Sequence, residues 1–340
     1  MSMCSPTFYC ELRMEDMPNN NENSIFGPPY PVFDGHCDLL YEMTRSHGGI
    51  SFDKLDDLPV TLEKMQASNV IVIVAALYCP DSYNGSPTSA RFLENLIDYA
   101  EEYLTPLFHV QSASTLEDCF REKKPGWIML VENADGLLDM DRGKLERTGL
   151  RVAGLTHMGR NRIGDGNNVP FPGGLTAEGK ALVRELMHKG FAFDVAHLAE
   201  PGFSDLARLH DGSLISSHTG VRALCDNPRN LTKEQVRVIL ERNGVVGIAA
   251  DPKMLSKSGE ATIEDVFRHI DWIAQSFETD GIGIGTDFCG FHTTNTGLED
   301  ISRLPALADM LAQRGYPEAS IQKIMGKNWY DFYFRLLQEK

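Results

Sequence analysis

The sequence of 340 residues has no surplus of positive charge and no long apolar run. Its 32 lysines and arginines are outnumbered by 48 aspartates and glutamates, which gives a formal net charge of −16. Because nucleic acids and anionic membranes bind basic surfaces, this charge argues against both as partners. The longest apolar run, residues 70–79, is far shorter than the roughly 20 residues that cross a bilayer.

Cysteine pairs with metal-binding or redox spacing are also missing. The seven cysteines are scattered along the chain, and none forms a CxxC pair. In a chain of this length, such cysteines are typical of reduced thiols in a cytosolic protein. The N-terminal segment lacks the basic and apolar regions of a secretory signal. We therefore expect a cytoplasmic location.

The distribution of apolar residues predicts an α/β fold. Residues 1–25 are polar and unpatterned, and we expect them to form a loose arm. From Pro31 onward, eight compact apolar runs alternate with helical patterns, as in a (β/α)8 TIM barrel of the amidohydrolase-like kind. The runs cover residues 32–38, 70–78, 127–132, 152–157, 191–197, 214–218, 245–250 and 282–287. Residues 26–340 are therefore predicted to form a single barrel domain.

Amphipathic segments between these runs carry the start and stop signals of helices. Residues 90–104 place apolar side chains at helical spacing, and residues 181–189 and 263–277 do the same. Thr232 and Gln235 have the spacing of a capping box, in which each side chain satisfies a backbone N–H at the start of a helix. We therefore expect helices on the outside of the barrel.

Histidines lie at the end of four of the apolar runs, where the strands of a barrel would open onto its mouth. They are His36, His157, His197 and His218, and three carboxylates occupy matching positions: Asp38, Glu132 and Asp287. Burying several carboxylates without a partner is costly, and cations would remove that cost. Because imidazole and carboxylate groups suit Zn²⁺, the pattern indicates a zinc site.

The spacing also indicates how two cations could share these side chains. A period of two along a strand places His36 and Asp38 on the same face, so both could reach one cation. His197 and His218 follow neighbouring strands and could hold a second cation, with Glu132 between the two. Two metal ions roughly 3.5–4 Å apart would hold a hydroxide at neutral pH and polarise a carbonyl group.

Each of these residues also has a structural explanation when it is taken alone. A histidine at a strand end is commonly a hydrogen-bonded structural group, and Asp38 or Asp287 could cap a following helix. Cys37 is expected in the core, whereas Cys289 follows Asp287 by two residues and could face the site. The remaining histidines are expected on helix faces or in loops: His47, His109, His188, His210, His269 and His292.

Seven segments, in this order and spacing, resemble the membrane (renal) dipeptidase family, which are zinc hydrolases with an amidohydrolase-like barrel. They are DGHCD at 34–38, VENADGL at 131–137, GLTHMGRNRIGDG at 154–166, FDVAHL at 193–198, ISSHTGVRALCDNPRNLT at 215–232, IGIGTDF at 282–288 and GYPEASIQKIMGKNW at 315–329. The resemblance covers nearly everything from Pro31 to the C-terminus. It departs from the family pattern at Cys289 and Asp331, where an acidic residue and an arginine are common, and at Ala196, where a serine is common.

The resemblance implies a site with two zinc ions. His36 and Asp38 would bind one ion and His197 and His218 the other, with Glu132 and a hydroxide bridging them. The bridging hydroxide would then attack the peptide carbonyl of a dipeptide.

The resemblance also implies roles for three further side chains. Asp287 would carry the proton of the hydroxide to the leaving amine, and His157 would stabilise the oxyanion. Arg229 would bind the terminal carboxylate of the substrate, a role suited to the bidentate geometry of a guanidinium. Without the resemblance, the sequence around Arg229 favours a surface arginine in a turn.

These considerations predict a dinuclear zinc dipeptidase for short L,L-dipeptides with a free carboxylate, with tolerance of a D-residue on the carboxyl side. A homodimer is consistent with the family. One alternative is a metal-dependent amidohydrolase acting on N-acyl amino acids or β-lactams, which would use the same metal site with different loop contacts. A second alternative, a metal-stabilised binding protein without turnover, would be expected to lack Asp287 or His157.

Overall fold

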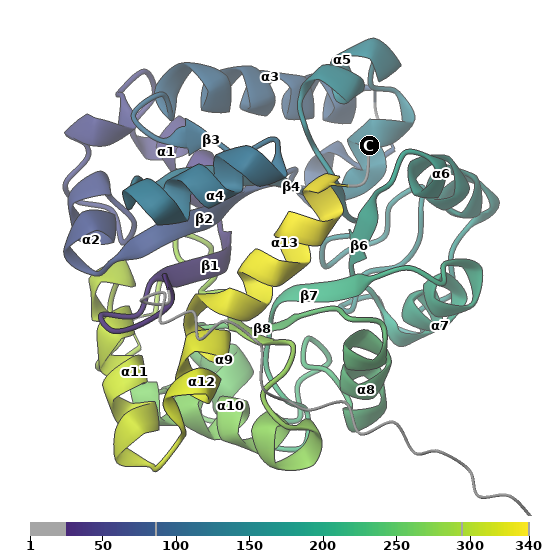
Figure 1. Ribbon diagram of the computed structural model, residues 1–340. Coiled ribbons are helices and arrows are strands. Elements are labelled where there is room, and N and C mark those ends of the chain that lie inside the picture. Colours follow the sequence, from purple (N-terminus) through teal and green to yellow (C-terminus); the bar gives the residue numbers. More distant parts are fainter. Residues whose placement is uncertain (1–24, 86, 294, 339–340) are drawn as a thin grey trace, which may run out of the picture.

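The eight predicted apolar runs form the parallel strands of one closed barrel in the computed structural model, which describes residues 25–85, 87–293 and 295–338 (Figure 1). The barrel strands are β1 (Val32–Cys37), β2 (Val70–Tyr78), β4 (Gly126–Glu132), β5 (Val152–Gly154), β6 (Ala192–Asp194), β7 (Leu214–Thr219), β8 (Val246–Ile248) and β9 (Ile282–Ile284). They pair in the order β2-β1-β9-β8-β7-β6-β5-β4, and β4 pairs with β2 to close the barrel. The (β/α)8 prediction is confirmed.

A ninth short strand, β3 (Phe108–His109), was not predicted. It pairs only with the first two residues of β4, so that Phe108 lies opposite Gly126. The strand lies outside the closed barrel, and His109 in it stacks on the ring of Trp127 at 4.0 Å between centroids. His109 is therefore part of a strand, where the sequence pattern had indicated a loop before a helix.

Three of the predicted strands end three residues earlier than expected. His157, His197 and Asp287 each lie three residues beyond the end of β5, β6 and β9. His197 and Asp287 both have a positive φ of 63°, a conformation that few residues other than glycine adopt and that ends an extended strand. The chain therefore turns at the barrel mouth, and these three side chains are presented from turns.

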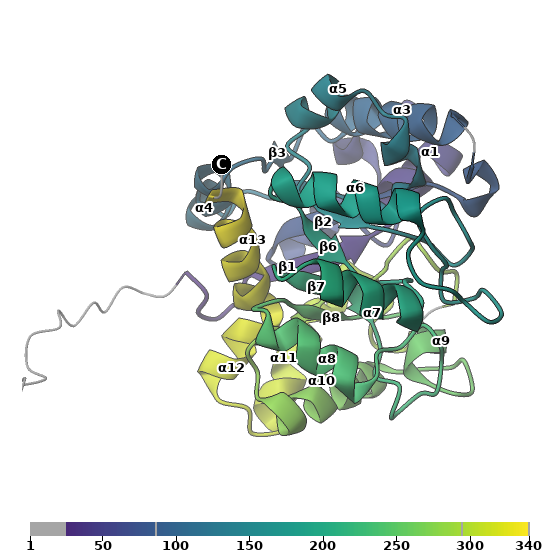
Figure 2. The same ribbon diagram turned by 90° about the vertical axis from the view of Figure 1, so that its right-hand side faces the viewer.

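Helices surround the barrel, as both ribbon views show (Figure 1, Figure 2). The α-helices are α1 (Leu39–Ser46), α2 (Leu62–Ala67), α3 (Thr88–Tyr103), α4 (Ala113–Glu122), α5 (Arg142–Arg147), α6 (Ala177–His188), α7 (Glu200–Leu209), α8 (Lys233–Glu241), α9 (Pro252–Leu255), α10 (Ile263–Phe277), α11 (Leu304–Gln313), α12 (Glu318–Gln322) and α13 (Asn328–Gln338). The shorter helical turns are η1 (Phe52–Lys54), η2 (Asp81–Tyr83), η3 (Ala134–Leu138), η4 (Ile301–Arg303) and the π-helical η5 (Lys323–Lys327).

The start signals explain where several of these helices begin. The capping box of Thr232 and Gln235 is present at the start of α8. Helix α10 has the predicted bounds, whereas α6 begins at Ala177, four residues earlier than its apolar pattern indicated. The reason is that the Thr176 hydroxyl accepts a hydrogen bond from the backbone N–H of Gly179 and so caps the helix one turn further back.

The amino-terminal end of the barrel is closed by the last helix, α13, which lies across the strands (yellow in Figure 1). The ring of Trp329 enters the barrel, and its Nε1 donates a hydrogen bond to the carbonyl of Ile284 at 2.8 Å. A Cβ atom at Gly35 or Gly283 would collide with this ring, so these strand positions must be glycine for the indole to fit. The rings of Phe33 and Tyr333 stack beside it, with centroids 5.4 Å apart.

None of the helices in the described part of the chain is both long and apolar enough to span a bilayer. The predicted loose arm, residues 1–25, lies outside the described residues except for Ile25. The assignment of residues 26–340 to a single domain stays a prediction.

Candidate active site

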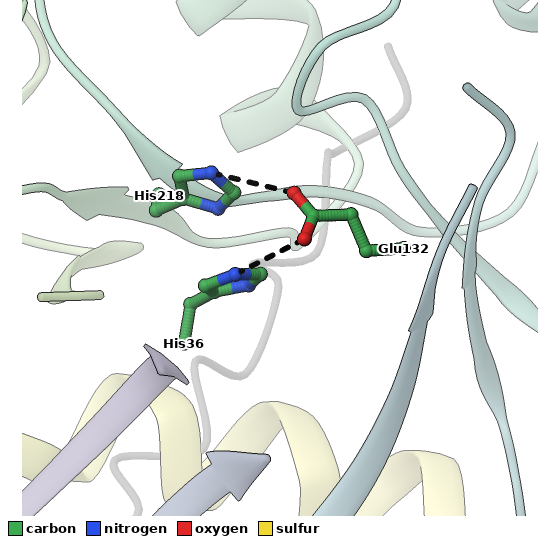
Figure 3. Close-up of side chains that lie close together, drawn as sticks. All are labelled: His36, Glu132 and His218. Carbon is green, nitrogen blue, oxygen red and sulfur yellow. Dashed lines mark ion pairs between the residues drawn. The ribbon is translucent and has the colours of Figure 1, made fainter. Parts of the chain in front are cut away.

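Three neighbouring side chains at the carboxyl ends of the strands face one another across the barrel mouth. His36 lies on β1, Glu132 ends β4, and His218 lies on β7 (Figure 3). One carboxylate oxygen of Glu132 lies 3.7 Å from Nε2 of His36, and the other lies 3.7 Å from Nε2 of His218. The two rings lie next to each other, with centroids 3.8 Å apart, and each faces a different oxygen of Glu132.

His197 and His157 extend this group from the turns after β6 and β5. Nε2 of His197 lies 2.8 Å from a Glu132 oxygen and 3.1 Å from Nε2 of His218. The ring of His157 lies beside that of His197, with centroids 4.5 Å apart. Potential ligand atoms of Glu132, His157 and His197 all lie within 4.8 Å of one another.

Asp38 and Asp287 complete a second group of potential ligands together with His36. The backbone N–H of Asp287 donates to the carbonyl of His36 at 3.0 Å, which brings the segment after β9 alongside the end of β1. Ligand atoms of His36, Asp38 and Asp287 lie within 4.8 Å of one another. A Cβ atom at Gly290 would collide with both carboxylates, so this turn requires a glycine.

The alternative roles considered for the two aspartates are not what the structure shows. Asp38 occupies the N-cap position of α1, but its side chain makes no capping hydrogen bond. Asp287 precedes no helix; it lies in a turn after β9. Cys37, between His36 and Asp38, is fully buried in the hydrophobic core, as predicted.

One serine hydroxyl orients two of the imidazoles. Oγ of Ser217 donates to a carboxylate oxygen of Asp194 at 2.5 Å. The same Oγ lies 3.1 Å from Nδ1 of His36 and 2.9 Å from Nδ1 of His218. Since the serine proton goes to Asp194, its oxygen accepts from the N–H groups of both rings, which leaves both Nε2 lone pairs directed into the site.

Burial and mutual repulsion disfavour the charged forms of these groups. Burial raises the pKa of Glu132 to about 7 and lowers the pKa of His36 to about 3. The pKa values of Asp38 and Asp287 are raised well above their usual range by burial and by the charge of Glu132. A cation placed among these carboxylates would reverse the shifts of the three acidic groups, because it stabilises their charged forms, and it would keep His36 neutral.

The chemical types and the positions of these residues fit a metal centre. Within the described ranges, Nε2 of His36 and Oδ1 of Asp38 are buried and have no hydrogen-bond partner. Unpartnered buried polar atoms are rare, and metal coordination is a common reason for them. Imidazole nitrogens and carboxylate oxygens are ligands that zinc binds well. The five predicted ligands are thus close enough to hold metal ions together.

Arg229 lies at the same mouth, and its position differs from the surface turn that its local sequence favoured. The residue is only 7% exposed, and its Nη2 donates to the carbonyl of His218 at 2.7 Å. Among the described groups, its Nε has no hydrogen-bond partner. It lines a cavity of about 270 Å³ together with the two catalytic candidates, Asp287 and His157.

Two further acidic residues lie at or beside this cavity. Asp251 directly follows the predicted strand 245–250 and is the N-cap residue of α9; it lines the cavity, and burial raises the pKa of its carboxyl group. Asp81, in η2, contacts His157. Asp251 therefore has the same strand-end position as the predicted ligands, whereas Asp81 lies outside that pattern and reaches the site through the folding of its loop.

Cys289 and the remaining histidines lie outside the ligand set. Cys289 lines an adjoining hollow of about 330 Å³ that shares Asp38 and His157 with the cavity. His269 was expected on a solvated helix face, but it is buried. Its Nδ1 accepts a hydrogen bond from the backbone N–H of Val221 at 2.8 Å, which gives it a structural role between α10 and the loop after β7.

Comparison with known proteins identifies the family. The family model described as "Membrane dipeptidase (Peptidase family M19)" matches residues 28–336. The chain belongs to the membrane dipeptidase family. Dipeptidase verJ of Clonostachys rogersoniana is 26% identical over 324 residues, which are 88% of this chain and 82% of that protein. A protein of Klebsiella pneumoniae described as an uncharacterized protein in the pqqA 5′ region is 32% identical over 230 residues, or 64% of this chain and 84% of that protein.

Solved structures of membrane dipeptidases share the whole barrel. The crystal structure of dipeptidase AC is 27% identical, with a TM-score of 0.82 over 91% of this chain and 98% of that chain. A metallo peptidase from Rhodobacter sphaeroides, solved with a phosphinate mimic of the dipeptide L-Ala-D-Ala, is 26% identical, with a TM-score of 0.80 and the same coverage. This membrane dipeptidase is therefore a metal-dependent hydrolase that acts on small peptides.

Proposed function

We propose that this membrane dipeptidase hydrolyses dipeptides that have a free carboxylate, and that it uses two zinc ions. The position of Glu132 carries the proposal, because one of its oxygens faces His36 and the other faces His197 and His218. His36 and Asp38 would hold one ion and His197 and His218 the other, with Glu132 shared. When bound, the ions supply Lewis acidity for the scissile carbonyl and make water a nucleophile at neutral pH.

Asp287 is proposed to move the proton in the reaction. Its carboxylate lies near both Asp38 and His36, so it is within reach of a water molecule held at the centre of the site. A carboxylate in this position can accept a proton and release it again during one reaction cycle. The side chain would take the proton from the attacking water and give it to the leaving amine.

His157 and Arg229 are proposed to bind two negatively charged groups of the substrate. One is the oxyanion that forms during the reaction, and the other is the terminal carboxylate. His157 faces the cavity beside Glu132 and His197, where a donor could stabilise the oxyanion of the attacked carbonyl. Arg229 has a buried Nε without a partner in the described part of the chain, and a carboxylate would provide one. These two positions would fix a dipeptide in one orientation.

The substrate preference follows from this arrangement and from a relative. The Rhodobacter sphaeroides enzyme carries a phosphinate mimic of L-Ala-D-Ala, which supports acceptance of a D-residue on the carboxyl side in this chain as well. Two similar proteins are named dipeptidases, which supports dipeptides as the substrates of this chain over N-acyl amino acids or β-lactams. The cytoplasmic location and the homodimer stay predictions; light scattering of the purified protein tests the second.

One experiment tests the proposed function. The purified protein is analysed for bound metals and assayed with matched L,L- and L,D-dipeptides, with N-acetyl amino acids and a β-lactam as alternative substrates. We expect two zinc equivalents per chain and turnover of the dipeptides, inhibited by a dipeptide phosphinate. Turnover of the N-acetyl amino acids or the β-lactam without turnover of dipeptides would contradict the proposal.

A further inference from the structure

Asp81 contacts His157, and the proposed function assigns no role to this contact. Oδ2 of Asp81 lies 3.3 Å from Nδ1 of His157. The aspartate lies in η2, between β2 and α3, and so belongs to a different part of the chain from the turn that carries His157. No feature of the sequence around Asp81 indicates this contact.

The Asp81 carboxylate is fixed in place by the turn that follows His157. The backbone N–H of Gly159 donates to Oδ2 at 2.8 Å. A Cβ atom on Gly159 would lie 2.9 Å from the same oxygen, so the close approach depends on glycine at this position. The other oxygen, Oδ1, accepts from Nδ2 of Asn84 at 3.1 Å.

A row of asparagine side chains supports Asn84 in turn. Nδ2 of Asn133, the residue after Glu132, donates to Oδ1 of Asn84 at 2.7 Å. Nδ2 of Asn161 donates to Oδ1 of Asn133 at 2.8 Å. Both Asn133 and Asn161 are buried. The position of Asp81 is therefore determined by side chains from three separate loops around the site.

The ring of His157 is also held on its faces. The ring of Tyr78 lies against it at 4.7 Å between centroids, and the ring of His197 lies 4.5 Å away. With Nδ1 engaged by Asp81, the remaining nitrogen, Nε2, is the atom left to act on a substrate. A carboxylate accepts but does not donate, so Nδ1 carries a hydrogen, and only the cationic ring then also donates from Nε2.

We propose that Asp81 is the positioning residue of His157: it accepts a hydrogen bond from Nδ1 and so holds the imidazole with Nε2 facing the substrate. This inference rests on the proposed function, in which His157 binds that oxyanion. Asp81 itself touches neither substrate nor metal ligand in this role. Partial burial raises the pKa of Asp81, but the interactions with His157, Gly159 and Asn84 together outweigh burial, and the net shift is downward, so the group remains a carboxylate at neutral pH.

Four variants test the proposal on the zinc-loaded enzyme. Asp81→Asn removes the charge at constant size, and Gly159→Ala displaces the carboxylate without altering it. His157→Gln removes the imidazole, and the double variant Asp81→Asn/His157→Gln closes a mutant cycle. Asp57→Asn is the matched control, because Asp57 also pairs with a histidine, His47, at 3.0 Å, but lines neither the cavity nor the adjoining hollow.

We expect Asp81→Asn and Gly159→Ala each to lower kcat by about 10–100-fold, in line with the loss of a group that orients a functional histidine. The KM for the dipeptide should change by less than about threefold, because the ground-state carbonyl gains little from His157. The Ki of a dipeptide phosphinate should rise with the loss of kcat, because the phosphinate carries the oxyanion charge. Zinc content should stay at the wild-type value, and the Asp57→Asn control should behave as wild type.

The mutant cycle gives the decisive result. In the His157→Gln background, Asp81→Asn should have no further effect on kcat, because its partner is already absent. Independent, additive losses would overturn the proposal, as would wild-type kcat in both Asp81→Asn and Gly159→Ala. Loss of zinc from either variant would also overturn it and assign His157 to the metal ligands instead. Failure of the wild-type enzyme to cleave dipeptides would refute the proposed function. This result comes from the wild-type enzyme alone, so it is distinguishable from a failure of the Asp81 proposal, which only the variants can show.

Discussion

The two ends of the barrel are filled by side chains of opposite character. At the amino-terminal end, the Trp329 indole fills the interior, its one polar atom bonds a strand carbonyl, and glycines make room for it. At the carboxyl-terminal end, three buried carboxylates and three buried imidazoles face one another, and burial opposes the charge on each of them.

The comparison shows that the amino-terminal end stabilises the fold, whereas the carboxyl-terminal end destabilises it when no cation is bound. An aromatic ring packed among glycines stabilises the barrel with no help from a ligand. The clustered acids and imidazoles at the other end are favourable only with cations between them. Binding and chemistry are thus confined to the carboxyl-terminal end, as in other (β/α)8 enzymes. The predictions that follow test this division, beginning with the largest effect.

Asp287→Asn should abolish most turnover while the barrel and its metals remain. Because the amide cannot take up or release the proton, we expect kcat to fall by about 10²–10⁴-fold. Steady-state kinetics combined with zinc analysis measures both quantities on the same sample. Near-normal turnover of dipeptides by this variant would remove the proton-transfer role from Asp287.

Trp329→Ala should act on stability rather than on chemistry. Loss of a fully buried aromatic side chain at the closed end is expected to cost about 3–5 kcal/mol of the free energy of unfolding. Urea denaturation measures this cost, and Trp272→Ala, at a half-buried position on α10, is the control with the smaller loss. A change in zinc affinity without a change in stability would contradict the separation of the two ends.

Arg229→Ala should weaken binding at the mouth selectively. The KM for dipeptides with a free carboxylate should rise by about 10–100-fold, the range for losing a charged hydrogen bond. Dipeptide amides, which lack the carboxylate, should be affected far less. Equal effects on both substrates would mean that Arg229 supports the fold of the mouth and does not bind the carboxylate.

Ser217→Ala should lower metal affinity, since the hydroxyl orients both His36 and His218. We expect a loss of about 10–100-fold in zinc affinity, as is typical for groups that orient metal ligands. Competition with a chelator of known affinity provides the measurement. Ser216→Ala is the matched control, because Ser216 is equally buried and adjacent, yet its hydroxyl contacts neither ring. The same affinity loss in both variants would indicate a general effect of packing.

The metal-free protein should lose the stability that protonated Glu132 provides as the pH rises to about 7, and Glu132 should cause no further loss above that value. Near this pH the buried His36 is already neutral in the folded chain. The pKa of Glu132, however, is about 7 in the folded protein against 4.5 unfolded, so the folded state holds a proton that the unfolded state has lost. Melting temperatures at several pH values, with and without zinc, test this. A slope as steep with zinc as without it would contradict a cation at Glu132.

Much of this arrangement is readable from the sequence because it depends on local patterns. The apolar runs predict the eight strands, and the positions of His36, Glu132 and His218 in those runs place them at the mouth. The turns are a different matter. The left-handed conformations of His197 and Asp287 do not follow from a period of two, and they explain why the predicted strands were too long.

Contacts between loops that are distant in the sequence could not be predicted from local patterns. Arg229 resembles a surface residue in its own turn, and its burial comes from the strands and loops around it. Asp81 lies 76 residues from His157 in the chain, and Ser217 lies 181 residues from His36. Such pairs form only when the barrel closes. The supporting groups of the site are therefore harder to predict than its ligands.

In the part of the chain that the structure describes, Trp329 fills the amino-terminal end of the barrel, and the cavity lies at the carboxyl ends of the strands. In the proposed function, a dipeptide would enter and both product amino acids would leave at this end, past Arg229. The fragment that retains the original carboxylate would linger there longest. Free amino acids should consequently compete with dipeptides for the site. In concentrated amino-acid mixtures, the turnover rate would then depend on product release as much as on bond cleavage.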